Sequence, residues 1–268
     1  KANFNISGRR SDDFVHMPAI ETEEHICVSQ FTLKEIIRQT IFSIAPNENN
    51  KLMTGELFEV KDDNLKVVSL DGHRISIRNV QLKEHYENRK VVVPGKTLME
   101  ISRILPGDAD KDVMIFFSKN HILFQFDQTL VLSRLIEGEY FKIDQMISSD
   151  FETKITVNKR ELLDSIERSV LLVRESDKKP IIINIKDSNM ELSLNSMIGS
   201  MREDILVRHT GKDIMIGFNP RFMIDALRVI DDEEISVYMV NSKAPCFIRD
   251  DEGKYIYLIL PVNFTVSH

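Results

Sequence analysis

Apolar side chains recur at the helical period of about 3.6 residues in four segments of the chain. These segments are 32–44, 94–105, 158–174 and 220–230. Proline opens the second and the fourth, where the first helical turn tolerates it. The pattern therefore predicts four amphipathic helices, each with one face in a core.

Short runs of alternating apolar and polar residues lie between and after these helices. Such alternation is typical of half-buried antiparallel strands. Ser118-Lys119-Asn120 is a plausible hairpin turn between two of the runs. The predicted strands are 75–77, 113–117, 122–126, 131–135, 190–194, 235–239 and 255–260.

The helices and strands form an internal repeat. Lys-Asp-Asp-Asn-Leu at 61–65 is echoed by Lys-Asp-Ser-Asn-Met at 186–190, and the helices recur at nearly the same offset. Each copy runs helix, strands, helix, strands. Because strands follow strands without intervening helices, we predict an α+β unit in tandem and not a βαβ unit.

Composition narrows the class of protein. The chain has 268 residues, 42% of them hydrophobic and 29% charged, which excludes disordered and collagen-like classes. It contains no apolar run of the roughly 20 residues that span a bilayer, and no signal-peptide pattern. Cys27 and Cys246 follow no metal-ligand spacing, so we expect a reduced, cytoplasmic protein without metal or disulfide.

Charge is distributed unevenly between the helices and the rest. The net charge of −7 argues against a simple nucleic-acid-binding protein. The four helices, however, carry ten basic and six acidic residues, so the excess of acid lies elsewhere. Basic helix faces suit a polyanion contacted through its phosphates, although solvated faces with helix-supporting ion pairs explain the same pattern.

The segment 69–75, Ser-Leu-Asp-Gly-His-Arg-Ile, carries the most conspicuous candidate chemistry. Asp71 and His73 suggest an acid–base or metal site, but no further ligand or catalytic motif accompanies them. An Asp-Gly turn between two strands explains Asp71 and Gly72. The equivalent stretch of the second copy, 195–199, lacks the His-Arg pair, which indicates a specialised role for His73 and Arg74.

Four motifs together resemble one family. They are Leu-Asp-Gly-His-Arg-Ile-Ser at 70–76, Glu-Gly-Glu-Tyr at 137–140, Gly-Phe-Asn-Pro at 217–220 and Leu-Pro-Val at 260–262. The chain resembles the bacterial sliding clamp, the β subunit of DNA polymerase III, over residues 1–264. The resemblance implies the DNA-clamp fold, an α+β fold of repeated domains, each with two helices packed on antiparallel sheets.

The resemblance also implies a domain organisation. Residues 27–148 would be the middle domain and 149–268 the C-terminal domain, with 1–26 the tail of a preceding domain. The family forms a head-to-tail homodimeric ring of three-domain protomers around duplex DNA. Because the chain begins at Lys1, near the end of the first domain, we expect the 268-residue polypeptide to be a monomer.

In the family, the helices line the central hole and face DNA without reading its sequence. The implied DNA-facing residues are Lys34, Arg38, Lys96, Arg103, Lys159, Arg168, Arg221 and Arg228.

Clamps also hold short linear peptides in an apolar groove between the middle and C-terminal domains. The implied partners are the DNA polymerase III α subunit, the clamp loader and repair polymerases, with no cofactor, no metal and no catalysis. The groove would comprise Met53, Leu70, Gly72, His73, Arg74, Ile75, Phe141, Gln145, Met146, Leu258, Leu260, Pro261 and Val262.

Three positions depart from the usual family pattern. Phe141 replaces a common proline, and Asn50 and Asn263 stand where arginine is frequent. These departures bear on the shape and charge of the groove. Two other classes of function stay open from the residues: a nuclease or other DNA-modifying enzyme that uses Asp71 and His73, and a peptide-binding scaffold that does not bind DNA.

Overall fold

The computed structural model describes residues 2–13, 25–46, 49–173 and 179–264. It confirms the four predicted helices within a few residues at each end. Arg174, where the third helix was expected to end, lies outside the described residues. The helices are α1 (Gln30–Thr40), α2 (Gly95–Ile104), α3 (Lys159–Val170) and α4 (Pro220–Val229).

Side-chain caps fix where three of these helices begin. Ser29 Oγ accepts a hydrogen bond from the Thr32 amide, and Asn158 and Asn219 cap α3 and α4 in the same way. Pro220 is the first residue of α4, as predicted. Pro94 instead precedes α2 in an extended conformation with no side-chain cap, because it is the last residue of a long strand.

The strands form three antiparallel sheets. Two have four strands each, in the orders β1-β4-β5-β6 and β10-β9-β8-β12, and one has seven, in the order β11-β7-β13-β14-β15-β3-β2. The strands are β1 (His25–Ser29), β2 (Gly55–Leu70), β3 (Arg74–Pro94), β4 (Asp112–Phe117), β5 (His121–Phe126), β6 (Thr129–Arg134), β7 (Thr153–Asn158), β8 (Ile181–Lys186), β9 (Asn189–Asn195), β10 (Ser200–Leu206), β11 (Arg208–Gly211), β12 (Ile214–Phe218), β13 (Glu234–Met239), β14 (Cys246–Arg249) and β15 (Tyr255–Ile259). Short 3-10 turns are η1 (Ser11–Asp13), η2 (Ile41–Ser43), η3 (Lys51–Thr54) and η4 (Ile143–Gln145).

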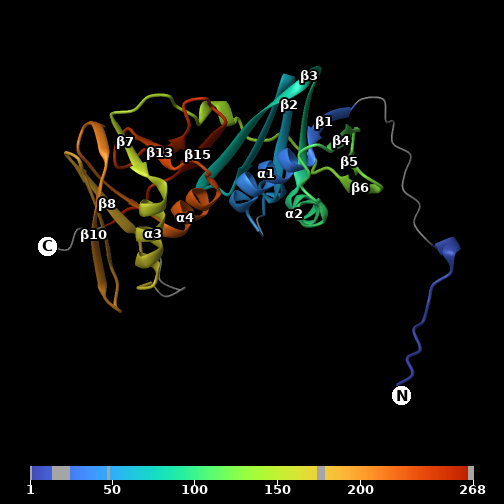
Figure 1. The fold of residues 1–268 in the computed structure, drawn as a ribbon, viewed down its shortest axis with the longest axis horizontal. Helices are drawn as coiled ribbons and strands as arrows, with labels where there is room; N and C mark the ends of the chain where they lie inside the picture. Colours follow the sequence, from blue (N-terminus) through green and yellow to red (C-terminus); the bar gives the residue numbers. More distant parts are fainter. Residues whose placement is uncertain (1, 14–24, 47–48, 174–178, 265–268) are drawn as a thin grey trace.

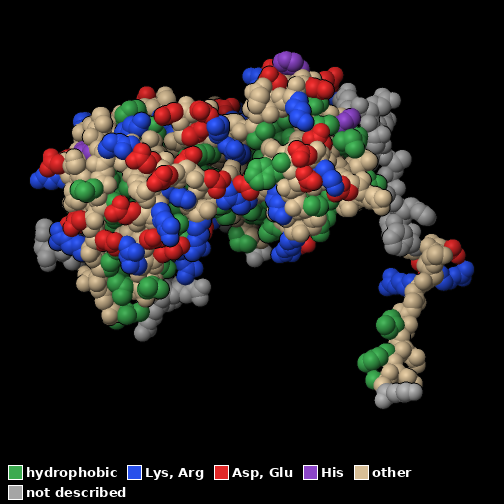
Figure 2. Space-filling view, viewed as in Figure 1, with side chains coloured by type: hydrophobic (Ala, Val, Ile, Leu, Met, Phe, Trp, Pro, Cys, Tyr) green, Lys and Arg blue, Asp and Glu red, His purple; other side chains and the backbone are tan. Residues whose placement is uncertain are grey.

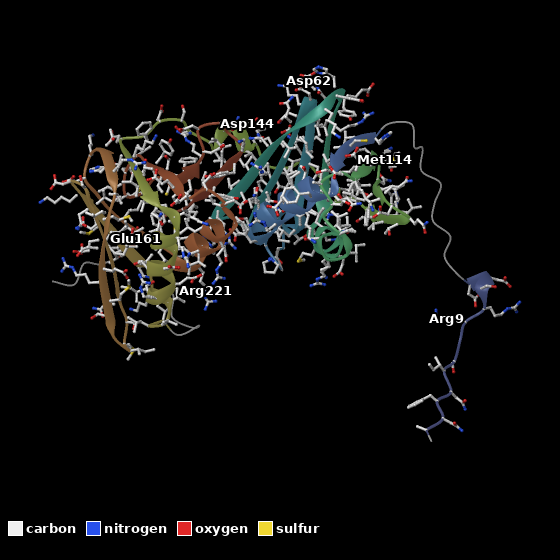
Figure 3. The ribbon with its side chains drawn as sticks, viewed as in Figure 1. Arg9, Asp62, Met114, Asp144, Glu161 and Arg221 are labelled. Carbon is white, nitrogen blue, oxygen red and sulfur yellow. The ribbon has the colours of Figure 1, made fainter. Side chains whose placement is uncertain are left out.

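The hairpin of β2 and β3 is far longer than the strand predicted at 75–77. Residues 83–90 of β3 are mostly polar and exposed, so the apolar alternation that marks a strand is missing there. Asp62 has a positive φ of 52° at a register shift in the middle of β2, and its side chain lies at the top edge of the molecule in Figure 3. The predicted turn at 118–120 is confirmed, because the Ser118 amide donates to His121 O between β4 and β5.

The repeat is visible in strand register. Leu70 lies opposite Ile75 in the first copy, and Asn195 lies opposite Ser200 in the second, at the same offset of 125. Asp187 has the same φ of 52° as its counterpart Asp62. Each copy encloses a buried core of its own: Leu33 and Leu98 lie in one and Leu162 and Leu227 in the other.

The two copies are joined because β3 pairs with β15, which places strands from both in the seven-stranded sheet. The four helices lie in a row along one side of this sheet (Figure 1). Strand β1 begins at His25, two residues before the domain boundary expected at Cys27, and pairs with β4. None of the helices in the described parts of the chain is long and apolar enough to cross a membrane.

Candidate functional site

The segment 71–73 forms the tight turn that links β2 to β3. Asp71 Oδ1 accepts hydrogen bonds from the amides of His73 (3.0 Å) and Arg74 (3.1 Å). Gly72 has a φ of +83°, in the left-handed region that glycine adopts without strain. The Asp-Gly turn predicted from the sequence is therefore confirmed.

Arg74 connects the two repeats. Its side chain is only 10% exposed and donates to Asp71 Oδ2 (3.0 Å) and to Asp225 Oδ2 on α4 (2.6 Å). It also donates to Phe42 O (2.5 Å), and its guanidinium lies 4.5 Å from the centre of the Phe222 ring. Arg74 is thus held at the junction by groups from three elements, which the local sequence did not indicate.

His73 lies beside the C-terminal segment. Its carbonyl oxygen accepts the Leu260 amide (2.9 Å), and its exposed ring stacks on Phe222 with the ring centres 6.0 Å apart. Leu260 is 36% exposed. The chain beyond it is anchored, since the Val262 amide donates to Gly217 O (2.9 Å), with Pro261 and Val262 half-buried.

A row of apolar side chains crosses five neighbouring strands at this junction. The residues lie directly opposite one another in the sheet and share one buried cluster. In strand order they are Tyr238, Phe247, Leu258, Ile75 and Leu70. Because each is less than 10% exposed, Leu70, Ile75 and Leu258 form the buried base of the candidate groove.

The segment that connects the two repeats covers this base. Tyr140 and Ile143 are buried in the cluster, and Phe141 and Met53 pack against it while partly exposed. Phe141 and Tyr140 form a T-shaped, edge-to-face pair, with ring centres 5.5 Å apart. At this position, where the family often has proline, the chain therefore has an aromatic ring that contributes to the packing.

The remaining predicted groove residues lie at the exposed margin. Gln145 ends η4 and is exposed, and Met146 follows with 45% of its surface exposed. Asn50 Oδ1 caps η3 by accepting the Leu52 amide (3.1 Å), and Asn263 is exposed. The structure thus unites Met53, Leu70, Ile75, Phe141 and Leu258 in one cluster and places His73 beside Leu260.

Sequence reasoning missed several residues that shape this junction. Phe222 and Asp225 on α4 hold Arg74 and His73, and Phe42 lies under Arg74. The Gly-Phe-Asn-Pro motif identified the start of α4, two residues before Phe222. Nothing local in the sequence indicated that α4 lies against the turn of β2 and β3.

The geometry does not support the nuclease hypothesis. Both carboxylate oxygens of Asp71 accept hydrogen bonds from the turn and from Arg74. The described residues also contain no group of three His, Cys, Asp or Glu side chains placed to hold a metal ion. Asp71 is therefore engaged in shaping the turn.

In each repeat, one predicted DNA-facing lysine donates a hydrogen bond to the C-terminal end of the neighbouring helix. Lys34 Nζ donates to Leu105 O just after α2 (3.0 Å), and Lys159 Nζ donates to Ile230 O just after α4 (2.9 Å). A cation there complements the partial negative charge at a helix C-terminus. Both lysines are half-buried, so they contribute to helix packing as well as to charge.

Four of the five predicted DNA-facing arginines are paired with acidic residues. Arg38 pairs with Glu35 and Asp231, Arg103 with Glu100, Arg168 with Glu203 and Arg228 with Glu167. Figure 2 accordingly shows acidic and basic side chains interspersed over the face in view. The positive charge of the helices is therefore partly neutralised locally.

The first turns of α2 and α4 carry two exposed cations at equivalent positions. Lys96 has no hydrogen-bond or ion-pair partner among the residues that the structure describes. Arg221 lies 125 residues later, on the side of the molecule where the helices lie (Figure 3). Both positions are exposed at the start of their helices.

Comparison with known proteins places the chain in a family. Residues 27–142 match the central domain of the DNA polymerase III β subunit, and residues 144–263 match its C-terminal domain. The β sliding clamp of Staphylococcus epidermidis is 32% identical over 265 residues, which cover 98% of this chain and 70% of that protein.

Solved structures agree. A putative DNA polymerase III β subunit from Eubacterium rectale is 69% identical, with a TM-score of 0.96 over 98% of this chain and 72% of that one. The sliding clamp of Bacillus subtilis is 33% identical, with a TM-score of 0.92 over 95% and 68%. The arrangement of helices and sheets is consistent with these matches. The chain belongs to the bacterial β sliding clamp family, the β subunits of DNA polymerase III.

Proposed function

We propose that this sliding clamp encircles duplex DNA as part of a homodimeric ring and holds the replicative polymerase on its template. The α subunit of DNA polymerase III, the clamp loader and repair polymerases would attach through short linear peptides, without catalysis by the clamp and within the cytoplasm. The observation that carries the proposal is the apolar junction of the two repeats, where buried Leu70, Ile75 and Leu258 lie next to partly exposed Leu260 and Phe141.

The division into domains belongs to the same proposal. Residues 27–148 would act as the middle domain and 149–268 as the C-terminal domain, with 1–26 as the end of a preceding one. The two family matches and the separate cores of the repeats support this division. A peptide seated at the junction would contact both domains, because Ile75 and Leu258 come from different repeats and lie directly opposite each other.

Peptide titration tests the groove. A peptide of the Gln-Leu-x-Leu-Phe type should bind saturably, and a peptide with alanine at the Leu and Phe positions should not. Leu260→Asp should weaken binding at least about tenfold, because a charge would replace an apolar anchor. Leu206→Asp is a matched control, since Leu206 is 80% exposed on β10 and outside the junction. Equal loss in both variants, or no binding to the parent chain, would refute the groove.

Retention on DNA tests the encirclement. The full-length three-domain clamp, assembled on nicked circular DNA, should remain bound during gel filtration and be released when the DNA is linearised. A peptide-binding scaffold without DNA would be retained on neither form. Lys96→Glu and Arg221→Glu should reduce retention and its dependence on salt, because both side chains are exposed on the helix side. His73→Ala should alter peptide affinity only, and loss of an intrinsic nuclease activity would favour the enzyme hypothesis.

The expected monomeric state of the 268-residue polypeptide stays a prediction that light scattering measures. A ring-sized dimer of this polypeptide would contradict it.

A further inference from the structure

A cavity of about 350 Å³ lies at the domain junction, away from the candidate groove. Tyr255 and Arg78, which face each other across β15 and β3, line it together with Gln39 near the end of α1 and Ile230 just after α4. The groove residues His73 and Leu260 lie at the other end of the same strand pair. The ten residues of α4 separate the two places by about 15 Å.

Acidic side chains dominate the walls of this cavity. Six carboxylates and three basic groups line it. Three of the carboxylates have an ion-pair partner: Asp231 with Arg38, Glu234 with Arg208 and Glu252 with Lys254.

The other three carboxylates accept hydrogen bonds from uncharged groups. Asp232 accepts the Tyr255 hydroxyl (2.7 Å), Asp250 the Tyr255 amide (3.2 Å) and Asp251 the Tyr238 hydroxyl (3.3 Å). None of the three has a basic ion-pair partner within the described ranges. The lining cations are Arg78, Arg249 and Lys254, so six carboxylates outnumber three basic groups and the cavity wall has an excess of negative charge.

Gln39 supplies an independent sign that a ligand belongs here. Its side chain is 7% exposed and lines the cavity, yet its Oε1 atom has no hydrogen-bond partner among the described residues. Leaving a buried amide oxygen unpaired is unfavourable by about 1–3 kcal/mol. Arg78 Nε is also buried in the same wall, with no hydrogen-bond partner in the described parts of the chain. An acceptor and a donor thus both lack partners next to uncompensated carboxylates.

We propose that this cavity binds an arginine side chain presented by a segment of a partner protein. A guanidinium offers five N–H donors, enough for Gln39 Oε1 and the carboxylates of Asp232 and Asp250 together. The backbone carbonyl of the same segment would accept from Arg78 Nε. A nucleic-acid phosphate would meet the excess negative charge and be repelled.

The proposed occupant would bridge the two repeats. Gln39 and Arg78 belong to the first repeat, and Asp232 and Asp250 belong to the second. Binding would therefore tie the domains together at the end of the junction opposite the candidate groove, which makes this a second docking point for partners and independent of the peptide groove.

Calorimetric titration with N-acetyl-arginine amide tests the proposal. We expect saturable binding that weakens as salt is raised, and no binding of N-acetyl-citrulline amide, a neutral compound of nearly the same shape. Gln39→Leu and Asp232→Asn should each weaken binding at least about tenfold, and Asp62→Asn, in the middle of β2 and outside the cavity, should leave it unchanged. Equal binding of the citrulline compound would overturn the assignment of charge recognition.

The variants also locate the site. Asp232 is exposed, and asparagine still accepts the Tyr255 hydroxyl, so this variant carries the test if Gln39→Leu fails to fold. Circular dichroism checks the fold of each. Binding that neither variant weakens, or no binding of N-acetyl-arginine amide to the parent chain, would overturn the proposal. Titration of the Gln-Leu-x-Leu-Phe peptide should be unaffected by both variants, which separates this cavity from the groove.

Discussion

Glu56 is a carboxylic acid fully buried on β2, next to the apolar junction. Neither of its carboxylate oxygens has a hydrogen-bond partner within the described part of the chain. Burial raises its pKa from 4.5 to about 8. At neutral pH the folded protein therefore holds a proton here that the unfolded chain has released.

This bound proton makes the free energy of unfolding depend on pH. Because the folded state binds it more tightly, the free energy of unfolding falls as pH rises between 4.5 and 8. Each pH unit in this window lowers it by about 1.4 kcal/mol. The total is about 3 kcal/mol by pH 7 and about 5 kcal/mol above the folded-state pKa.

Glu56→Gln removes the proton and keeps the shape of the side chain. The variant should match the parent near pH 5 and become more stable than it as pH rises, by about 3 kcal/mol at pH 7. Urea unfolding followed by circular dichroism at four pH values between 5.5 and 8.5 measures the difference. Glu59→Gln is the control, since Glu59 on the same strand is 29% exposed and paired with Lys90, and should change stability by less than about 1 kcal/mol. Parallel curves for Glu56→Gln and the parent would refute the reasoning.

Three further predictions concern the junction, a turn and the thiols. Arg74→Met should lower the free energy of unfolding by about 3 kcal/mol, because it leaves Asp71 and Asp225 without their ion-pair partner. Arg103→Met is the control: the Arg103 side chain is 70% exposed, so this change should lower the free energy of unfolding by under about 1 kcal/mol. Equal losses would contradict the role of Arg74. Gly211→Ala should lower the free energy of chemical unfolding by more than about 2 kcal/mol, because φ is +103° and the added Cβ would lie 1.9 Å from Glu152 O. Gly253→Ala, whose Cβ would meet open space, should lower it by about 1 kcal/mol. Similar values for the two variants would argue against the clash. In the native protein a thiol reagent should modify half-buried Cys27 before Cys246, because burial raises the pKa of the Cys246 thiol to about 12; Cys246 reacting first in peptide mapping would overturn this.

Long-range pairing explains what the sequence did not reveal about the sheets. Around the register shifts of the β2–β3 hairpin, at 61–62 and 83–90, most residues are exposed, so they show no apolar alternation. The pairing of β3 with β15 joins residues about 180 positions apart, such as Ile75 and Leu258. Such pairing depends on the packing of whole domains, which a local pattern does not encode.

The candidate site divides in the same way. The Asp71-Gly72 turn was predictable because its geometry is set by neighbouring residues. The partners of Arg74, by contrast, come from α4 and from the chain after α1, and only the fold brings them together. The family resemblance implies that Lys34 and Lys159 face DNA, and only the structure shows that each holds the end of a neighbouring helix.

The amino-acid sequence by itself determined the four helices, the tandem repeat, the α+β class and the turn at Asp71, because each depends on periodicity or on contacts within a few residues. Tertiary structure decided which apolar residues form the buried base of the junction and where the cations find partners. It also decided that Gln39 and Glu56 are buried with no hydrogen bond to their side-chain oxygens from any described residue. These features arise where segments that are distant in the chain pack together and exclude water. A local pattern of residues does not predict which distant segments will meet.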